Sequence, residues 1–370
     1  MNSTKKTKIL FLVQLPPPVH GVSMMNEITL SSVEIVKMFD TKVVSLNYTK
    51  EIKRIGKFSF KKVLSFLRIY KNIFRALIKF KPNMVYFTLT PTGNSFYRDV
   101  LIVMLLKLSK TKIVYHLHGK GIYKKTKNSK ITKTIYKLVF KNTYVIHLSE
   151  ILKKDIVLVN NKVKSFVIPN GINKLKHLNK KKSNGNTKKL LFLSNLAENK
   201  GVIMFLLACK HLKDSNISFA ANVVGRETTL ISEQDIKDKI IELNLDKEVT
   251  YLGPKYDDEK EEVLENSKIF VFPTYNDCFP LVLLEALKHG LPVISTNEGA
   301  ISEIIDDGKN GYVVERKNQE QLNNKLKELL LDEKKIQEFS KNSREKFNKY
   351  YTTEAYEQNM LSVLKSIANG

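Results

Sequence analysis

The sequence of 370 residues has two cysteines, ten prolines, no tryptophan and no long hydrophobic run. The two cysteines, Cys209 and Cys278, are too few for a disulfide scaffold, and no other ligands flank them at the spacing of a zinc module. The longest apolar runs, such as Val100 to Leu106, fall far below the ~20 residues that a membrane-spanning helix needs. The apolar stretch Ile9–Val13 is short and is followed by three prolines, so we interpret it as a buried strand rather than a signal peptide.

Acidic side chains are scarce in one half of the chain only. The whole sequence has 62 Lys and Arg against 37 Asp and Glu, a formal charge of +25. Residues 1–185 contain 37 basic and 7 acidic residues, whereas residues 186–370 contain 25 basic and 30 acidic residues. An AT-rich genome explains some of the lysines but not this asymmetry. The first half is therefore predicted to meet an anionic partner: nucleic acid, phospholipid headgroups or a phosphorylated substrate.

Short apolar or β-branched runs alternate with helix-length amphipathic segments, and this pattern occurs twice. Continuous apolar strands separated by helices are typical of parallel sheets covered on both faces. The predicted strands are Lys8–Val13, Met84–Thr88, Ile113–Leu117, Thr143–Leu148, Phe166–Ile168, Leu190–Ser194, Ser218–Val224, Lys268–Phe272, Pro292–Ser295 and Gly311–Val314. At about 150 residues per domain, the length also predicts two domains, each of the doubly wound α/β class.

The boundary between the two domains is predicted near Asn170-Gly171. The stretch that follows is rich in lysine and asparagine and contains the turn signal Asn184-Gly185-Asn186. We therefore predict an N-terminal domain over residues 1–170, a linker over 171–188 and a C-terminal domain over 189–350. Residues 351–370 are predicted to form a final amphipathic helix.

The most informative window runs from Tyr275 to Ala286. A predicted strand ends at Pro273, Pro280 suits the first position of a helix, and Asn276 or Asp277 can cap that helix. Free amides at such a helix start form an anion site suited to a diphosphate. Glu285 is the only carboxylate of the apolar helix, and its burial is costly unless polar groups such as sugar hydroxyls satisfy it. The alternative is a capped helix with a structural glutamate.

Seven residues separate Asp277 from Glu285, and the segment Gly290-x-Pro292-Val293-Ile294 follows. In this spacing the chain resembles the retaining nucleotide-sugar glycosyltransferases of family 4. Further segments extend the resemblance over essentially the whole chain. They are Pro16–Gly21, His116–Gly119, Ile168–Gly171, Asn199–Gly201 and Asp307–Gly311. The resemblance implies the GT-B fold, in which two Rossmann-like doubly wound domains face each other across a cleft. It also implies that the last helix returns toward the N-terminal domain and that domains close on the donor.

The resemblance assigns roles to residues of the second half. Asp277, where the family usually has Glu, would contact hydroxyls of the donor sugar, and Glu285 would hold the ribose of the nucleotide. The donor diphosphate would be neutralised by Lys200 and by a helix start. That start comprises Phe279, Pro280, Leu281 and Val282.

The sequence also departs from the family pattern. The family often has an Arg a few residues before the Lys, and the matching place is Ser194-Asn195. One positive charge is therefore missing beside Asn195, and Arg226 is the candidate to replace it. Cys278 stands where the family usually has Gly, and Gly299-Ala300 stands where the family has two glycines. Glu303 is retained. These departures indicate a subfamily.

Two residues of the first half belong to the predicted site. Gly21 would open the first helix and let the backbone approach the donor phosphates, although an ordinary strand–helix turn explains this glycine equally well. His118 ends a strand and has the same parity as His116. A lone histidine at a strand end is more often structural, but within His-x-His-Gly we predict that His118 binds the donor sugar or the acceptor.

The predicted chemistry is transfer of a hexose or N-acetylhexosamine, with retention, from a nucleotide sugar that is UDP-linked by family frequency. Negative charge builds on the departing diphosphate and needs cations or amide dipoles. No two aspartates are spaced as Asp-x-Asp, so we predict no metal and no other cofactor. The acceptor would be a hydroxyl of a glycan or of a polyprenyl-diphosphate-linked sugar in surface-polysaccharide (capsule or O-antigen) synthesis.

The basic first half suggests where the protein works. Residues 50–81 contain eleven Lys and Arg and one acid, Glu51, with interleaved apolar side chains, and a second lysine cluster spans 120–137. Such a basic amphipathic helix suits an anionic membrane surface. The alternative is a core stripe with a solvated lysine face. We predict a cytoplasmic protein bound peripherally to the inner face of the cell membrane, without a nucleic-acid partner.

Two other functions stay open at this point. A nucleic-acid-binding protein would use the basic half alone and leave the motif around Glu285 unexplained. A sugar-nucleotide epimerase on the same fold would release free sugar without an acceptor.

Overall fold

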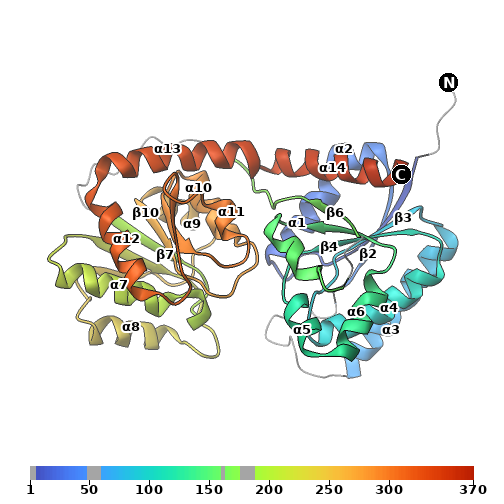
Figure 1. The fold of residues 1–370 in the computed structure, drawn as a ribbon, viewed down its shortest axis with the longest axis horizontal. Coiled ribbons are helices and arrows are strands. Elements are labelled where there is room, and N and C mark those ends of the chain that lie inside the picture. The colour runs from blue at the N-terminus through green and yellow to red at the C-terminus, as the bar shows by residue number, and fades with distance from the viewer. Residues whose placement is uncertain (1–5, 48–59, 160–162, 176–187) are drawn as a thin grey trace. The chain divides into compact units, whose positions relative to one another are not determined.

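The computed structural model describes residues 6–47, 60–159, 163–175 and 188–370, apart from the side chains of residues 60–62. The chain divides into two compact units (Figure 1). Unit 1 comprises residues 1–171 and 353–370, and unit 2 comprises residues 172–352. Most of the predicted linker, residues 176–187, lies outside the described residues.

Unit 1 is built on a six-stranded parallel sheet in the order β2-β1-β3-β4-β5-β6. Its strands are β1 (Lys8–Val13), β2 (Asp40–Ser45), β3 (Met84–Phe87), β4 (Lys112–Leu117), β5 (Tyr144–His147) and β6 (Lys164–Val167). The interior strand β1 is apolar at every position from Ile9 to Val13, and all five side chains are buried. Alternate residues face opposite sides, so Leu10 and Leu12 enter one core while Phe11 enters another.

Helices cover both faces of the unit 1 sheet. One face carries α3 (Phe60–Lys79), α4 (Asn94–Leu108), α5 (Ile122–Asn128), α6 (Lys130–Phe140) and the short 3-10 helix η2 (Ile151–Ile156). The other face carries α1 (Gly21–Ser31), α2 (Val33–Met38) and α14 (Thr353–Asn369). The C-terminal helix thus completes the core of unit 1. Tyr356 of α14 lies 2.6 Å from Thr29 of α1, hydroxyl to hydroxyl.

Unit 2 repeats the architecture with a parallel sheet in the order β12-β11-β10-β7-β8-β9. The strands are β7 (Lys189–Leu193), β8 (Ala220–Val224), β9 (Val249–Tyr251), β10 (Ile269–Phe272), β11 (Val293–Thr296) and β12 (Gly311–Val314). The helices are η3 (Glu198–Lys200), α7 (Val202–Asp214), α8 (Glu233–Glu242), α9 (Asp257–Glu265), α10 (Leu281–Lys288), α11 (Ile301–Ile304), α12 (Gln319–Leu331) and α13 (Glu333–Tyr350). The central strand β10 pairs with β7 and β11.

The predicted fold class, two Rossmann-like α/β units, is confirmed, and all ten predicted strands exist with ends shifted by at most two residues. The sequence analysis missed β2 and β9. Both lie at sheet edges, and each has one buried side chain, Val44 in β2 and Val249 in β9. An edge strand with one covered position lacks the apolar run by which the central strands are recognised.

No helix among the described residues is long and apolar enough to cross a membrane.

Candidate active site

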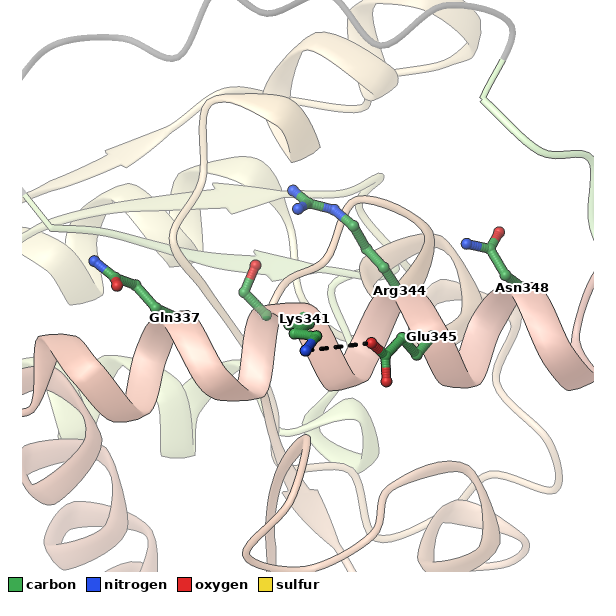
Figure 2. A pocket seen from close by; sticks show the side chains of 6 residues that line it. Gln337, Lys341, Arg344, Glu345 and Asn348 are labelled. Atoms are coloured by element: carbon green, nitrogen blue, oxygen red, sulfur yellow. Dashed lines mark ion pairs between the residues drawn. The ribbon is translucent and has the colours of Figure 1, made fainter.

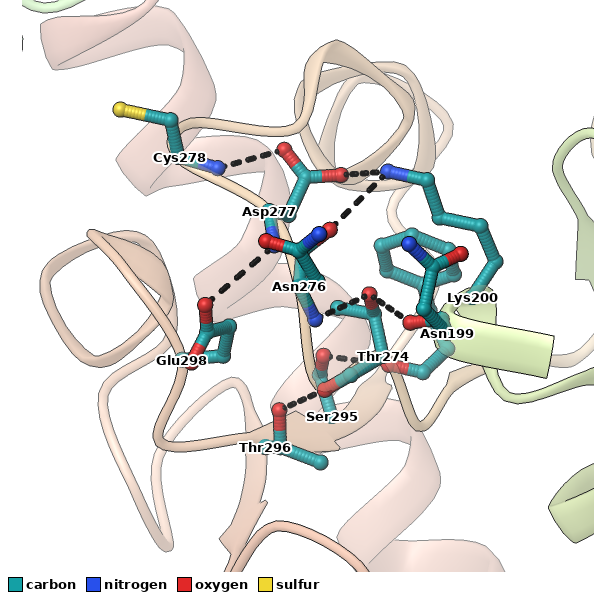
Figure 3. Close-up of polar contacts among 10 residues, drawn as sticks. Asn199, Lys200, Thr274, Asn276, Asp277, Cys278, Ser295, Thr296 and Glu298 are labelled. Carbon is teal, nitrogen blue, oxygen red and sulfur yellow. Dashed lines mark hydrogen bonds and ion pairs between the residues drawn. The ribbon is translucent and has the colours of Figure 1, made fainter. Parts of the chain in front are cut away.

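Two loops of unit 2, one after β7 and one after β10, bring a lysine and a carboxylate together (Figure 3). Lys200 Nζ lies 2.6 Å from Asp277 Oδ2, and the two side chains are 25% and 17% exposed. The other carboxylate oxygen of Asp277 accepts the Cys278 backbone N–H at 2.8 Å. Both loops follow the carboxyl ends of parallel strands, where ligands of doubly wound sheets bind. The predicted pair of donor-site residues is therefore in direct contact.

Glycine at position 201 allows these two loops to meet. Gly201 has a φ of +86°, and a Cβ there would lie 2.3 Å from the carbonyl oxygen of Pro273. Asn199 O accepts two hydrogen bonds from the β10 loop, one from Thr274 Oγ1 at 2.9 Å and one from Tyr275 N at 3.0 Å. Backbone contacts thus fix the loop that carries Lys200 against the loop that carries Asp277.

Glu298 contacts the backbone of the loop that carries Asp277, and the sequence analysis did not identify this residue. Its Oε1 accepts the Asp277 backbone N–H at 3.4 Å, and Arg316 Nη1 donates to its Oε2 at 2.8 Å. The Glu298 side chain is 2% exposed, so these two hydrogen bonds pair a buried carboxylate. Gly299 follows with a φ of +56°, and a Cβ there would lie 2.5 Å from Cys278 O. The altered glycine pair, Gly299-Ala300, marked this segment in the sequence, but nothing there distinguished Glu298.

The start of α10 differs from the prediction. Pro280 is the residue before the helix, with φ −71° and ψ 117°, and not its first residue. Neither Asn276 nor Asp277 caps the helix, since no side-chain cap bond is present in this described segment. The Asp277 carboxylate is already held by Lys200 and the Cys278 amide. Leu283 N already donates to Pro280 O at 3.1 Å, so in this described segment the amides without an acceptor are those of Leu281 and Val282, as an anion site requires.

The four residues predicted at this helix start are not equally placed for a ligand. Phe279 is buried and lies edge-on to Tyr351, with ring centroids 6.2 Å apart. Its side chain belongs to the core, and Pro280 has no amide hydrogen. Leu281 and Val282 are partly exposed and supply the first helical amides. Of the four, these two offer donors to an anion.

Glu285 in α10 has a protein partner that the sequence analysis did not anticipate. Its Oε1 accepts a hydrogen bond from Lys260 Nζ of α9 at 2.7 Å, and the two side chains are 12% and 24% exposed. The polar groups that this buried carboxylate requires therefore include a protein side chain, Lys260, and the predicted ribose contact stays a prediction. Lys260 is the one basic residue beside the six acids of Asp257–Glu265, and this contrast is a signal in the sequence that could have identified it.

A second ion pair runs the opposite way between the same two helices. Glu261 of α9 accepts from Lys288 Nζ and His289 Nε2, each at 2.7 Å. The hydrogen bond from His289 is the main cause that lowers the pKa of Glu261 to about 2, with Lys288 adding to it. Together with Lys260–Glu285, this contact fixes α10 to α9 at two successive positions and thereby orients the helix that carries Glu285.

Replacing Glu261 with glutamine is expected to lower the melting temperature of unit 2 at neutral pH by roughly 2–4 °C. The lowered pKa means that the ionised carboxylate stabilises the fold above its unfolded value near 4.5 and that this contribution is lost as pH falls toward 2. Melting curves from pH 7 to pH 2.5 should show the two proteins converging. Glu262→Gln, an exposed neighbour, is the control, and an equal loss there would contradict the assignment.

The positions around the missing family arginine lie at the ends of β7 and β8. Asn195 is exposed, and Leu196 N donates to Arg226 O at 2.8 Å, so Arg226 is held beside the β7 loop. A Cβ on Gly225 would collide with the Ser194 carbonyl oxygen at 1.7 Å, which explains the glycine before Arg226. Arg226 is exposed and follows the carboxyl end of β8, the strand next to β7, which precedes Lys200. Its placement is compatible with a second cation for a diphosphate.

Gly21 and His118 lie in unit 1: Gly21 follows the loop after β1, and His118 comes directly after β4. Gly21 is the first residue of α1, whose N-cap is His20, with Ser23 N donating to His20 Nδ1 at 3.2 Å. The His118 ring lies 4.0 Å from that of His116, as the shared parity predicts. Burial, and then the nearby His20, lower the pKa of His118 to about 3. His118 is thus neutral at physiological pH, and in the described structure its buried Nε2 has no partner.

A surface hollow elsewhere in unit 2 is not part of this site. It lies along α13, and its lining comes from that helix alone (Figure 2). The lining residues are Gln337, Ser340, Lys341, Arg344, Glu345 and Asn348. Arg344 donates to His289 O at 3.2 Å, and Lys341 pairs with Glu345 at 3.8 Å. None of the predicted site residues borders the hollow.

Comparison with known proteins identifies the second half of the chain. Residues 173–346 match the family described as Glycosyl transferases group 1. This segment is a glycosyl transferases group 1 domain. The matched segment contains the predicted donor-site residues Asn195, Lys200, Arg226, Asp277 and Glu285, whereas the predicted site residues Gly21 and His118 lie outside it.

The similarity to curated proteins covers about half of the chain. The putative colanic acid biosynthesis glycosyltransferase WcaL of Salmonella typhimurium is 26% identical over 199 residues, which are 50% of this chain and 47% of that protein. The chain thus spans about half the length of such curated relatives.

Two solved structures show the same fold over nearly the full length. A glycosyltransferase from Rickettsia africae has a TM-score of 0.75 at 20% identity, with 98% of each chain covered. Anabaena HepE in complex with UDP-glucose has a TM-score of 0.70 at 17% identity, with 97% of this chain and 99% of that chain covered. At these identities the likeness establishes the fold, which is GT-B.

Proposed function

We propose that the chain is a retaining, metal-independent glycosyltransferase of family 4. It would move a hexose or N-acetylhexosamine from a UDP-sugar to a hydroxyl of a glycan or lipid-linked acceptor during surface-polysaccharide synthesis. The observation that carries the proposal is the contact between Lys200 and Asp277 at 2.6 Å, next to the uncapped start of α10. The loops at the carboxyl ends of β7 and β10 thus offer a cation and free amides to a diphosphate, and a carboxylate to sugar hydroxyls.

The donor ligand would rearrange the ion pairs that are present without it. Lys200 is a flexible, partly exposed side chain and would turn from Asp277 to the diphosphate, joined by the amides of Leu281 and Val282. Asp277 would then accept from hydroxyls of the sugar. Arg226, at the next strand, would add the charge that the Ser194-Asn195 position lacks. Glu285 would accept from the ribose hydroxyls while Lys260 holds it in place.

The transfer step needs no protein nucleophile. The bond between the sugar C1 and the β-phosphate oxygen breaks, and the electron pair stays on that oxygen. The acceptor hydroxyl oxygen bonds to C1 on the same face, and its proton passes to the departing phosphate oxygen. Lys200 and the amides of α10 stabilise the charge that grows on the diphosphate. Neutral His118 would hydrogen-bond to the donor sugar or the acceptor through its Nε2, and Gly21 would let the backbone approach the donor.

Further observations support parts of this proposal. The solved Anabaena relative binds UDP-glucose, and the Salmonella relative is named for colanic acid biosynthesis. The sequence lacks Asp-x-Asp, the usual metal-binding pattern of the other common glycosyltransferase fold. The two cysteines and the basic first half fit a cytoplasmic enzyme at the inner face of the membrane. The group 1 match favours a transferase over a nucleic-acid-binding protein, which would leave the donor-site residues without a role.

Replacing Glu285 with alanine is expected to weaken UDP binding roughly 10- to 100-fold, because hydrogen bonds between a carboxylate and the ribose are lost. Isothermal titration with UDP measures this directly. Glu265→Ala, which removes an exposed acid of α9, should leave affinity unchanged. Unaltered UDP affinity in a folded Glu285→Ala protein would contradict the role of Glu285.

A screen of nucleotide sugars for donor hydrolysis is the experiment that tests the proposed activity. Turnover of one UDP-sugar above the others is expected, since the screen fixes base and sugar together. Hydrolysis of no nucleotide sugar, combined with duplex or RNA binding by the protein, would favour the nucleic-acid alternative.

A further inference from the structure

Helix α3 of unit 1 has two apolar stripes, and only one of them is buried. Ile69, Ile73 and Ala76 enter the core beneath the helix. On the opposite side Leu64, Leu67, Phe74 and Ile78 are each 49–55% exposed. The spacings of three, seven and four residues place these four side chains in one line along the helix. Folding of unit 1 requires the buried stripe but not the exposed one.

The exposed stripe is flanked by cations without counter-charges nearby in sequence. Arg68, Lys71 and Arg75 lie on the same outward side of α3, at helical positions beside the exposed apolar residues. Residues 63–140 contain sixteen Lys and Arg and a single acid, Asp99. That carboxylate is buried and paired with Arg98 at 2.7 Å. From α3 to α6, the described surface therefore presents cations and no exposed carboxylate.

The neighbouring helices on this face of the sheet extend the pattern. Leu101 and Leu108 of α4 are 53% and 86% exposed, and Ile131 and Leu138 of α6 are 77% and 50% exposed. Helices α3, α4 and α6 cover the same face of the unit 1 sheet, and α4 packs on α6. Lysines again accompany the exposed apolar side chains of α6. We name this surface, formed by the outward sides of α3, α4 and α6, the basic apolar face.

We propose that the basic apolar face docks on the anionic headgroups of a lipid bilayer, with Leu64, Leu67, Phe74 and Ile78 inserted among them. Cations attract an anionic surface over a Debye length, and the aliphatic side chains gain only where an apolar phase lies behind the charge. Nucleic acid offers the charge without that phase. A second copy offers the apolar surface, but two helices with six basic and no acidic residues each repel. The bilayer is the one occupant that matches both features.

This inference deepens the proposed function, since it brings the enzyme to a lipid-linked acceptor, but its test needs no nucleotide. The full chain is mixed with vesicles of phosphatidylcholine alone or with phosphatidylglycerol, and bound protein is measured by flotation. Binding to the mixed vesicles and little binding to phosphatidylcholine are expected. Arg68→Gln/Lys71→Gln/Arg75→Gln should weaken the partition roughly a hundredfold, and added salt should weaken wild-type binding. Leu67→Ser/Phe74→Ser should weaken it at least about tenfold at low salt as well.

Matched variants in unit 2 separate this face from general charge and hydrophobicity. Leu230→Ser/Leu331→Ser and Lys247→Gln/Lys334→Gln/Lys341→Gln alter exposed residues of the same kinds and should leave partition unchanged. Loss of binding only on charge removal, with Leu67→Ser/Phe74→Ser at wild-type level, would overturn insertion. A dimer that depends on Leu67 and Phe74 would assign the stripe to a second copy. UDP titration of the same variants is expected to be unchanged, so failure here is distinct from failure of the proposed function.

Discussion

Replacement of Lys200 with methionine is expected to lower kcat/KM for transfer by a factor on the order of a thousand. Lys200 follows the carboxyl end of β7, and its Nζ lies 2.6 Å from the carboxylate of Asp277, the other residue of the proposed site. Methionine keeps much of the length of the side chain but removes the charge that meets the diphosphate. Because the charge on the leaving group grows as the bond to the sugar breaks, the loss should appear in kcat as well as in UDP affinity.

The control for this variant is Lys210→Met. Lys210 lies in α7, ten residues further along, where it pairs with the exposed Asp214 at the helix surface. Its replacement should leave kcat/KM within about twofold of the wild type. Steady-state kinetics with the donor found in the hydrolysis screen measures both variants. If Lys200→Met retained wild-type kcat, the phosphate would have to be neutralised elsewhere, and Arg226 would be the next residue to replace.

Asp277→Asn is expected to lower kcat on the order of a hundredfold, while UDP affinity changes by no more than about threefold. Asparagine preserves the shape but loses the charge that binds the sugar hydroxyls as positive charge builds on the ring. UDP carries no sugar to be transferred, so its binding should depend on Lys200 and Glu285 instead.

The comparison that decides this point is between Asp277→Asn and Glu285→Ala. Kinetics and UDP titration are run on both, with the exposed Asp246→Asn as a neutral control. The first variant should affect turnover and the second affinity. If both lowered affinity alone and by similar amounts, the two assigned roles would be wrong.

The fold was predictable because burial on both faces leaves a continuous apolar run. Every side chain from Ile9 to Val13 in β1 and from Ile269 to Phe272 in β10 is buried, and each of these stretches is apolar throughout. The edge strands β2 and β9 carry polar side chains on their open sides and gave no such run. Register and pairing across the sheet follow from the order of the crossovers, which a single sequence does not encode locally.

The site was predictable only where a residue type is unusual for its place. Glu285 stood out because a carboxylate in an apolar helix is rare, and Asp277 and Lys200 through the family spacing. Lys260 and Glu298 were missed since their partners, Glu285 and the Asp277 amide, are more than twenty residues away in sequence. Ion pairs between separate elements depend on how the loops approach one another.

The measurement that tests the central claim most directly is calorimetric titration of the full chain with UDP, GDP and uridine. The claim is that unit 2 holds a nucleoside diphosphate at the carboxyl ends of its strands, between Lys200 and the start of α10. Saturable binding of a diphosphate, far weaker binding of uridine, and loss of the difference in Lys200→Met are expected. No heat from either nucleotide at millimolar concentration, or equal binding of UDP and uridine, would contradict the account.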